Sequence, residues 1–199
     1  MSNPKTLLEL SGADLSPARL DEACLVVIDC QNEYLDGPLA LPGGPAAVAQ
    51  AKRVLDAARA AGAPVIHIVH RGQAGGPFDL DAARGAIIAD LAPREGETVI
   101  RKTLPNAFAG TDLDAALKAT GRGKLLIVGF MTHMCVSATT RAAIDAGFMS
   151  TIVAGACATR DLPDGTGGVI TADEVHRVAL AELADRFAII VHDPDFYAG

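Results

Sequence analysis

The sequence predicts an α/β fold with three layers, in which helices cover both faces of a parallel β-sheet. Apolar, β-branched runs of strand length alternate along the chain with longer segments of helical periodicity. The runs are almost continuously apolar, which is typical of parallel strands buried on both faces. No linker, repeat or low-complexity stretch divides the 199 residues. We therefore expect one domain over residues 1–199, with residues 1–20 as an N-terminal arm.

The predicted strands are short apolar runs bounded by polar or glycine residues. In chain order they cover residues 23–30, 64–70, 97–102, 124–130, 149–156 and 187–192. The segments between them carry apolar residues at spacings of three and four, which predicts helices. These helices cover residues 43–61, 81–91, 112–120, 133–147 and 171–186, and the second is expected to be short. Repeated strand–helix units imply right-handed crossovers.

Residues that favour helix ends set several of these limits. Gly62 follows the first helical run and is expected to stop it. Thr111 or Asp112 is expected to cap the helix that follows the third strand. Thr171 and Glu174 form a capping-box pattern at the start of the last helix.

Composition and charge exclude several classes of function. The net charge is -7, from 17 basic and 24 acidic residues that are interspersed along the chain. Without a basic stripe, nucleic acid is not an expected partner. No apolar run approaches the ~20 residues of a membrane span. Because the N-terminal segment also lacks an apolar signal core, we expect a cytoplasmic protein with no membrane partner.

The four cysteines are expected to be free thiols in a reducing compartment. They form no C-x-x-C pair, so neither a zinc site nor a thioredoxin-type motif is predicted. Three of them lie in or beside apolar strands and are expected to pack in the core: Cys24, Cys30 and Cys157. Cys135 instead lies between a predicted strand and the start of a helix, where unpaired N–H groups and the helix dipole favour a thiolate.

Three chemically reactive residues follow three predicted strands. Asp29 ends the first strand, Lys102 the third, and Cys135 follows the fourth. Ligands bind at the carboxyl ends of strands in open α/β sheets. If the strand order is 3-2-1-4-5-6, the first and fourth strands are neighbours, and Asp29 faces Cys135. A carboxylate can then accept the thiol proton, and an ammonium group can stabilise the thiolate.

Each of these residues also has a structural explanation. Cys135 can be a small apolar residue at a helix start, since free cysteine is often buried and inert. Asp29 can cap or pair locally, and Lys102 can be an ordinary surface lysine. Their joint occurrence at three strand ends favours the functional interpretation.

The segments VVIDCQNEY, RKTLPNAF and GFMTHMCVSATTRAA, which contain these three residues, resemble the isochorismatase-like cysteine hydrolase superfamily. That superfamily includes nicotinamidases and N-carbamoylsarcosine amidohydrolases. The resemblance extends from about Leu25 to about Val191. It implies that Asp29, Lys102 and Cys135 form a catalytic triad on a six-stranded, Rossmann-like parallel sheet in the order 3-2-1-4-5-6.

The resemblance also implies two backbone features and an assembly. The peptide bond between Phe130 and Met131 is expected to be cis. The backbone N–H groups of Met131 and Cys135 are expected to form an oxyanion hole, which binds the charge that develops on the substrate oxygen. The protein is expected to be a homo-oligomer, either a dimer or larger.

The function that the resemblance implies is hydrolysis of a C–N bond in a small amide, carbamoyl or lactam compound, through a thioester acyl-enzyme. Two alternatives remain open. One is a vinyl-ether or ester hydrolase of the isochorismatase type on the same scaffold. The other is a non-enzymatic thiol redox sensor, which would not need a carboxylate and an ammonium group beside the thiol.

Five further residues are candidates for contacts with a small-molecule substrate: Gln31, Tyr34, His70, Phe108 and His133. Nicotinamidases carry a metal site with an Asp-x-His pair after the second strand, and HIVHRGQAGGPFDL contains no such cluster. His67 and His70 are three residues apart in a strand, so they point to opposite faces. We therefore expect no metal and no other cofactor.

Overall fold

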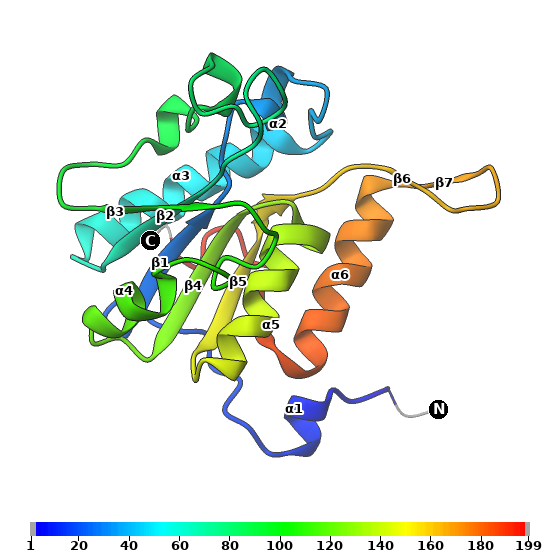
Figure 1. Cartoon of the computed structure of the whole chain (residues 1–199). Helices are drawn as coiled ribbons and strands as arrows, with labels where there is room; N and C mark the ends of the chain where they lie inside the picture. The colour runs from blue at the N-terminus through cyan, green and yellow to red at the C-terminus, as the bar shows by residue number, and fades with distance from the viewer. Residues whose placement is uncertain (1–2, 198–199) are drawn as a thin grey trace.

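Six parallel strands form the central sheet of the computed structural model, which describes residues 3–197 (Figure 1). They are β1 (Ala23–Ile28), β2 (Val65–His70), β3 (Thr98–Lys102), β4 (Lys124–Phe130), β5 (Met149–Ala158) and β8 (Ala188–Val191). Their order in the sheet is β3-β2-β1-β4-β5-β8, which confirms the predicted order 3-2-1-4-5-6. Residues 1–2 and 198–199 of the expected domain lie outside the described residues.

Helices cover both faces of this sheet, as predicted (Figure 1). One face packs against α3 (Gly44–Ala60), and the other packs against α4 (Leu113–Ala119), α5 (Ser137–Asp145) and α6 (Ala172–Arg186). Side chains of β1 alternate between the two layers. Leu25 and Val27 belong to the core on the α3 side, whereas Val26 and Ile28 belong to the core on the α4–α6 side. This double burial explains the unbroken apolar run of β1.

The predicted helix over residues 81–91 is wrong. The chain there forms two short 3₁₀ turns, η1 (Ala83–Gly85) and η2 (Ala89–Leu91). Between them it runs beside the segment that follows β1, since Ile88 N donates to Cys30 O at 2.9 Å and Asn32 N donates to Ala86 O at 3.0 Å. These contacts take backbone groups that a continuous helix would use for itself.

The segment predicted as one helix over residues 133–147 has two parts. A π-helical turn, η3 (Thr132–Val136), precedes α5, which ends at Asp145. Within η3, Val136 N donates to Met131 O, five residues earlier, at 3.2 Å. Single π turns occur frequently at functional sites. This turn contains Cys135.

Several short elements carry too little periodicity to be predicted. They are α1 (Leu7–Leu10) in the N-terminal arm, α2 (Glu33–Asp36) after β1, and a hairpin of β6 (Leu162–Pro163) with β7 (Val169–Ile170). Figure 1 shows this hairpin extending away from the body of the molecule beside the start of α6. None of the helices within residues 3–197 is long and apolar enough to cross a membrane.

The capping predictions are mostly confirmed. Thr171 and Glu174 form the predicted capping box of α6, with Glu174 N donating to Thr171 Oγ1 at 3.3 Å. Asp112 occupies the N-cap position of α4 but makes no side-chain cap bond. Thr111 supplies one instead, since its Oγ1 accepts from Leu113 N at 3.2 Å.

Candidate active site

Asp29 lies directly after β1 and leaves the strand conformation. Its φ is 49°, in the left-handed region that non-glycine residues rarely occupy. Ile28 faces the α4–α6 layer, so regular alternation would direct Asp29 to the opposite face. The carboxylate instead lies beside Lys102, whose strand neighbour Ile100 belongs to the α4–α6 layer. The left-handed turn therefore brings the carboxylate to the face that carries the site.

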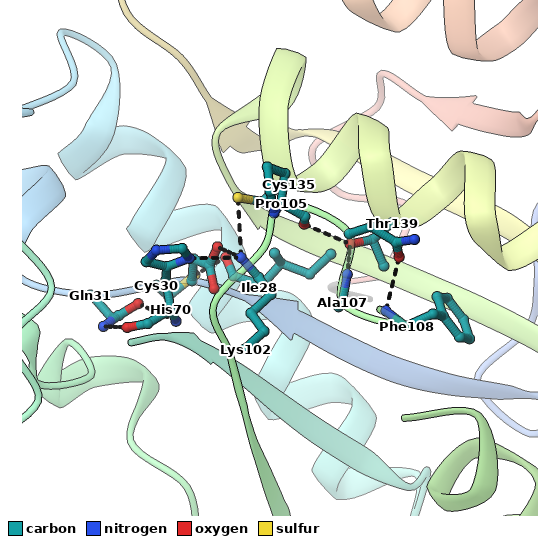
Figure 2. Close-up of polar contacts among 12 residues, drawn as sticks. Ile28, Cys30, Gln31, His70, Lys102, Pro105, Ala107, Phe108, Cys135 and Thr139 are labelled. Carbon is teal, nitrogen blue, oxygen red and sulfur yellow. Dashed lines mark hydrogen bonds and ion pairs between the residues drawn. The ribbon is translucent and has the colours of Figure 1, made fainter. Parts of the chain in front are cut away.

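Lys102 is the centre of a buried polar cluster, which Figure 2 shows. Its Nζ lies 2.6 Å from Asp29 Oδ2 and 3.2 Å from Cys135 Sγ. It also lies 3.4 Å from His70 Nδ1. Asp29, Lys102 and Cys135 are 0%, 1% and 5% exposed. The structure thus brings together the three residues that the sequence placed at three strand ends.

Close packing between β1 and β4 brings the cysteine turn to this cluster. Gly129 pairs with Ile28 in the register of the two strands and has a φ of 122°. A Cβ atom at Gly129 would lie 2.0 Å from Ile28 O, so only glycine permits this approach. One residue further on, the peptide bond between Phe130 and Met131 is cis. The π turn with Cys135 then begins at Thr132.

The surroundings of Cys135 favour the thiol over the thiolate. Burial raises its pKa to about 12, and the Asp29 carboxylate acts in the same direction, whereas Lys102 opposes the shift. Desolvation of the charged form therefore opposes the effect of the helix start, which favours a thiolate. Burial also raises the pKa of the Asp29 carboxyl, against the influence of Lys102 and Cys135. A carboxylate with a raised pKa is a stronger proton acceptor than an exposed one.

This arrangement permits proton transfer without a large change in local charge. When the Cys135 proton moves to Asp29, the negative charge moves from the carboxylate to the sulfur. Lys102 contacts both positions, so the ammonium group has an anionic partner before and after the transfer. Charges interact more strongly inside a protein than in water, so a fixed cationic partner stabilises the negative charge more there.

The two histidines of β2 lie on opposite faces, as predicted. His67 is buried on the far side, where its Nε2 lies 2.9 Å from Glu97 Oε2. His70 is half-buried beside Lys102, and its ring meets the Phe78 ring edge-on at 5.3 Å between centroids. Burial lowers the pKa of His70, and the nearby Lys102 charge lowers it further. Within residues 3–197, no group of three or more His, Cys, Asp or Glu side chains could hold a metal ion.

Gln31 and Tyr34, two predicted substrate contacts, make contacts within the protein, and their role toward a substrate stays a prediction. Gln31 is fully buried, and its amide nitrogen donates to His70 O at 3.0 Å and to Gly85 O at 2.7 Å. Its amide oxygen accepts from His70 N at 2.9 Å. The side chain therefore joins β1, β2 and η1. Tyr34 packs among aromatic rings, 5.0 Å from Phe78 and 5.5 Å from Phe130 between centroids.

Phe108 and His133, two further candidates, also contact other parts of the protein. Figure 2 shows the Phe108 ring on the far side of Thr139 from Cys135. That ring stacks on Phe148, with 6.5 Å between the centroids. His133 follows the cis peptide and is half-buried, and its Nδ1 contacts Thr159 Oγ1 at the end of β5. Of the five candidates, His70 is the one that contacts the triad through its side chain.

Two residues that support the site were not predicted. Thr139 of α5 accepts from Ala107 N at 3.0 Å and so fixes the loop that follows Lys102 (Figure 2). His176 of α6 lies 2.8 Å from Thr132 Oγ1 through its Nδ1 and so contacts the first residue of the π turn. These partners are 32 and 44 residues apart in the chain, and no local pattern signals the pairing.

Comparison with known proteins adds independent findings. The isochorismatase domain family matches residues 23–193 of this chain. A secreted isochorismatase effector of Verticillium dahliae is 36% identical over 196 residues, which span 98% of this chain and 99% of the relative. Because this relative is named as secreted, the cytoplasmic location stays a prediction.

A second relative and a solved structure extend the comparison. A ureidoacrylate amidohydrolase of Agrobacterium fabrum is 30% identical over 156 residues, covering 60% of this chain and 68% of the relative. The crystal structure of an isochorismatase from Pseudomonas putida superposes with a TM-score of 0.92 at 46% identity. That superposition covers 95% of this chain and 97% of the other.

Proposed function

The chain belongs to the isochorismatase family of hydrolases, and we propose that it hydrolyses a C–N bond of a small amide, carbamoyl or lactam compound with Cys135 as the nucleophile. The contact of Lys102 with both Asp29 and Cys135 carries this proposal. A redox sensor has no need of a buried ion pair beside its thiol. The name of the Agrobacterium relative, an amidohydrolase, supports C–N chemistry over vinyl-ether cleavage.

The first half of the reaction forms a thioester. Asp29 accepts the proton of the Cys135 thiol, and the thiolate attacks the carbonyl carbon of the substrate. The C=O bond opens to an oxyanion while the S–C bond forms. When the oxyanion collapses, the C–N bond breaks, and protonated Asp29 gives its proton to the leaving nitrogen. Ammonia or an amine departs, and the acyl group remains on Cys135.

The second half of the reaction releases the acid. Asp29, again a carboxylate, accepts a proton from a water molecule as the water attacks the thioester carbon. The S–C bond then breaks, and the proton held by Asp29 returns to Cys135. The products are a carboxylic acid and the free enzyme. Lys102 stays paired with whichever of Asp29 and Cys135 carries the negative charge.

The backbone N–H groups of Met131 and Cys135 are proposed to donate to the oxyanion. Met131 follows the cis peptide bond, and Cys135 lies in the π turn that begins at the next residue. Both residues lie just beyond the end of β4. Donors that are fixed before the reaction stabilise the developing charge without reorganising, and removal of one donor typically costs about 3 kcal/mol.

The direct test is ammonia release from a panel of small primary amides and ureido compounds. We expect cysteine-dependent release by the wild type and a loss of about 10³-fold or more in Cys135→Ala. Cys24→Ala is the matched control. Cys24 is also a buried cysteine, but it lies near the start of β1, whereas Asp29 follows the end of that strand. It should retain activity, and mass spectrometry of quenched wild-type reactions should find the acyl group on Cys135.

Two outcomes would contradict the proposal. Full activity in Cys135→Ala would remove the cysteine from the mechanism. Cleavage of esters or vinyl ethers that depends on Cys135, with no ammonia from any amide, would favour the alternative chemistry on the same scaffold. The homo-oligomer is part of the proposal and is measured by light scattering on the same preparations.

A further inference from the structure

Three polar side-chain atoms lie around the ammonium group of Lys102. A lysine ammonium donates three hydrogen bonds and accepts none. Its Nζ lies 2.6 Å from Asp29 Oδ2, 3.2 Å from Cys135 Sγ and 3.4 Å from His70 Nδ1. The first two contacts belong to the proposed mechanism. The third is not used by it.

The contact with Lys102 determines where His70 carries its hydrogen. Because the ammonium group can only donate, His70 Nδ1 must accept and therefore has no hydrogen. A neutral imidazole then carries its single hydrogen on Nε2, since the partner of one ring nitrogen decides the state of the other. The neutral form is supported by the lowered pKa of His70, which follows from burial and the Lys102 charge. His70 thus presents a fixed N–H donor on the side away from Lys102.

His70 lies at the less buried edge of the polar cluster. His70 and Lys102 are register partners at the carboxyl ends of β2 and β3. Asp29 and Lys102 are fully buried, whereas His70 is half-buried. Gln31 fixes the backbone of His70 from both sides, and the Phe78 ring packs edge-on against the imidazole. The ring is therefore held by its backbone, by Lys102 and by Phe78.

We propose that His70 is a specificity-determining residue, whose Nε2–H donates to an acceptor oxygen that the substrate carries close to the carbonyl attacked by Cys135. This inference rests on the proposed function and names a substrate class within it. The substrate is an amide with a second oxygen, from a carboxylate or another carbonyl group, bonded near the scissile carbon. Simple aliphatic amides lack that oxygen and leave the Nε2–H without a partner.

The distances limit how far away this second oxygen can be. Cys135 Sγ and His70 Nδ1 both contact Lys102 Nζ, so they are separated by no more than those two contact distances together. The attacked carbon must approach Sγ to about 3–3.5 Å. An oxygen a few bonds from that carbon can then accept from Nε2–H at about 2.9 Å. One small substrate can therefore contact both residues.

A matched pair of amides tests the proposal. Oxamate carries two carboxylate oxygens where isobutyramide carries two methyl groups. Three variants are compared with the wild type. His70→Asn keeps an acceptor near the Nδ1 position but loses the distal donor, whereas His70→Gln keeps a donor near the Nε2 position. His192→Asn is the control, because it alters an exposed histidine elsewhere. We expect the preference for oxamate to fall about 10- to 100-fold in His70→Asn and to persist in His70→Gln and His192→Asn.

The preference for oxamate over isobutyramide is also measured as a ratio of binding affinities, which does not depend on turnover. Cys135→Ala protein, with and without His70→Asn, is titrated with each amide, and ¹⁵N-labelled histidine reports the protonated ring nitrogen. We expect a hydrogen on Nε2 and weaker oxamate binding after His70→Asn. A hydrogen on Nδ1, or oxamate bound no better than isobutyramide when His70 is present, overturns the proposal. Selective binding without ammonia release by the wild type would instead contradict the amidohydrolase function and leave the role of His70 standing.

Discussion

Lys102 Nζ lies 2.6 Å from Asp29 Oδ2, although their strands β3 and β1 are separated in the sheet by β2. The lysine side chain therefore crosses the carboxyl end of β2 to reach its partner. Neither side chain is exposed to solvent. Removing two charges from water is costly, and in such a pair the loss of one partner leaves the other buried and uncompensated. Stability and chemistry therefore depend on the same pair.

Lys102→Met should lower both activity and stability. The substitution keeps most of the side-chain volume but leaves the Asp29 carboxylate without its cation. We expect the free energy of unfolding to fall by about 3–5 kcal/mol, as for other buried pairs that lose one partner. Urea denaturation measures the change. Lys118→Met is the control, since Lys118 pairs with Asp114 at 2.7 Å on the exposed surface of α4 and should change stability by less than about 0.5 kcal/mol. Equal effects of the two substitutions would mean that the buried pair contributes no more to the free energy of unfolding than the exposed pair does.

Gly129→Ala should prevent correct pairing of β1 with β4. The new Cβ would lie 2.0 Å from Ile28 O, at a φ of 122° that side chains rarely adopt. Because the contact is with backbone, no side-chain rotation can relieve it. We expect a loss of more than about 3 kcal/mol or no soluble protein. Gly123→Ala, where nothing lies within 4 Å of the added Cβ, should unfold like the wild type. A stable, active Gly129→Ala protein would show that the strands can separate at this point.

The fold was largely predictable because it depends on local periodicity. Apolar runs and helical spacings located the six strands, and the residues that follow them could then be assigned to one edge of the sheet. Asp29, Lys102 and Cys135 were found together for this reason. The segment over residues 81–91 was wrongly predicted because its backbone pairs with residues near Cys30, which local periodicity cannot reveal.

The finer properties of the site depend on contacts between distant residues. The left-handed φ of Asp29 reverses the face that strand alternation would give it. Burial raises the pKa of Cys135, although the helix start alone would lower it. Gln31 has an amide that could contact a ligand, but its side chain bonds to the backbone of His70 and of Gly85. None of these outcomes has a local sequence signal.

Glu97→Gln should reduce stability in a pH-dependent manner. Glu97 accepts from Arg59 through both oxygens at 2.8 Å, and these bonds are the main reason why its pKa is lowered to about 2. A depressed folded-state pKa adds stability above the unfolded value, and this stability is lost as the pH falls through the folded value. We expect a cost of about 2 kcal/mol near neutral pH that shrinks as the pH falls from about 5 toward 2. Urea denaturation at several pH values measures it, with exposed Glu95→Gln as the control. A pH-independent difference would mean that the charge of Glu97 is not responsible.

Asp29→Asn should make Cys135 more reactive toward alkylation while abolishing hydrolysis. In the wild type, burial and the Asp29 charge raise the thiol pKa, and Lys102 opposes them. Removing the carboxylate charge leaves Lys102 beside the sulfur, so the pKa of Cys135 should fall and its thiolate fraction should rise. The variant has nevertheless lost the group that carries protons to the leaving nitrogen and from water. Reactivity of the thiol and turnover should therefore change in opposite directions.

The measurement compares the rate of iodoacetamide labelling at Cys135, followed by mass spectrometry, with the rate of ammonia release. Near pH 8 we expect labelling of Asp29→Asn to be about 10-fold faster than that of the wild type, since a decrease of one pKa unit raises the thiolate fraction tenfold. Amide turnover should fall by about 10³-fold or more. The other three cysteines are buried and serve as internal controls for unfolding, because a loosened structure would expose them too. Slower labelling of Cys135 in the variant would show that Asp29 does not hold the thiol in its protonated form, and the proposed proton transfer would then need a different acceptor.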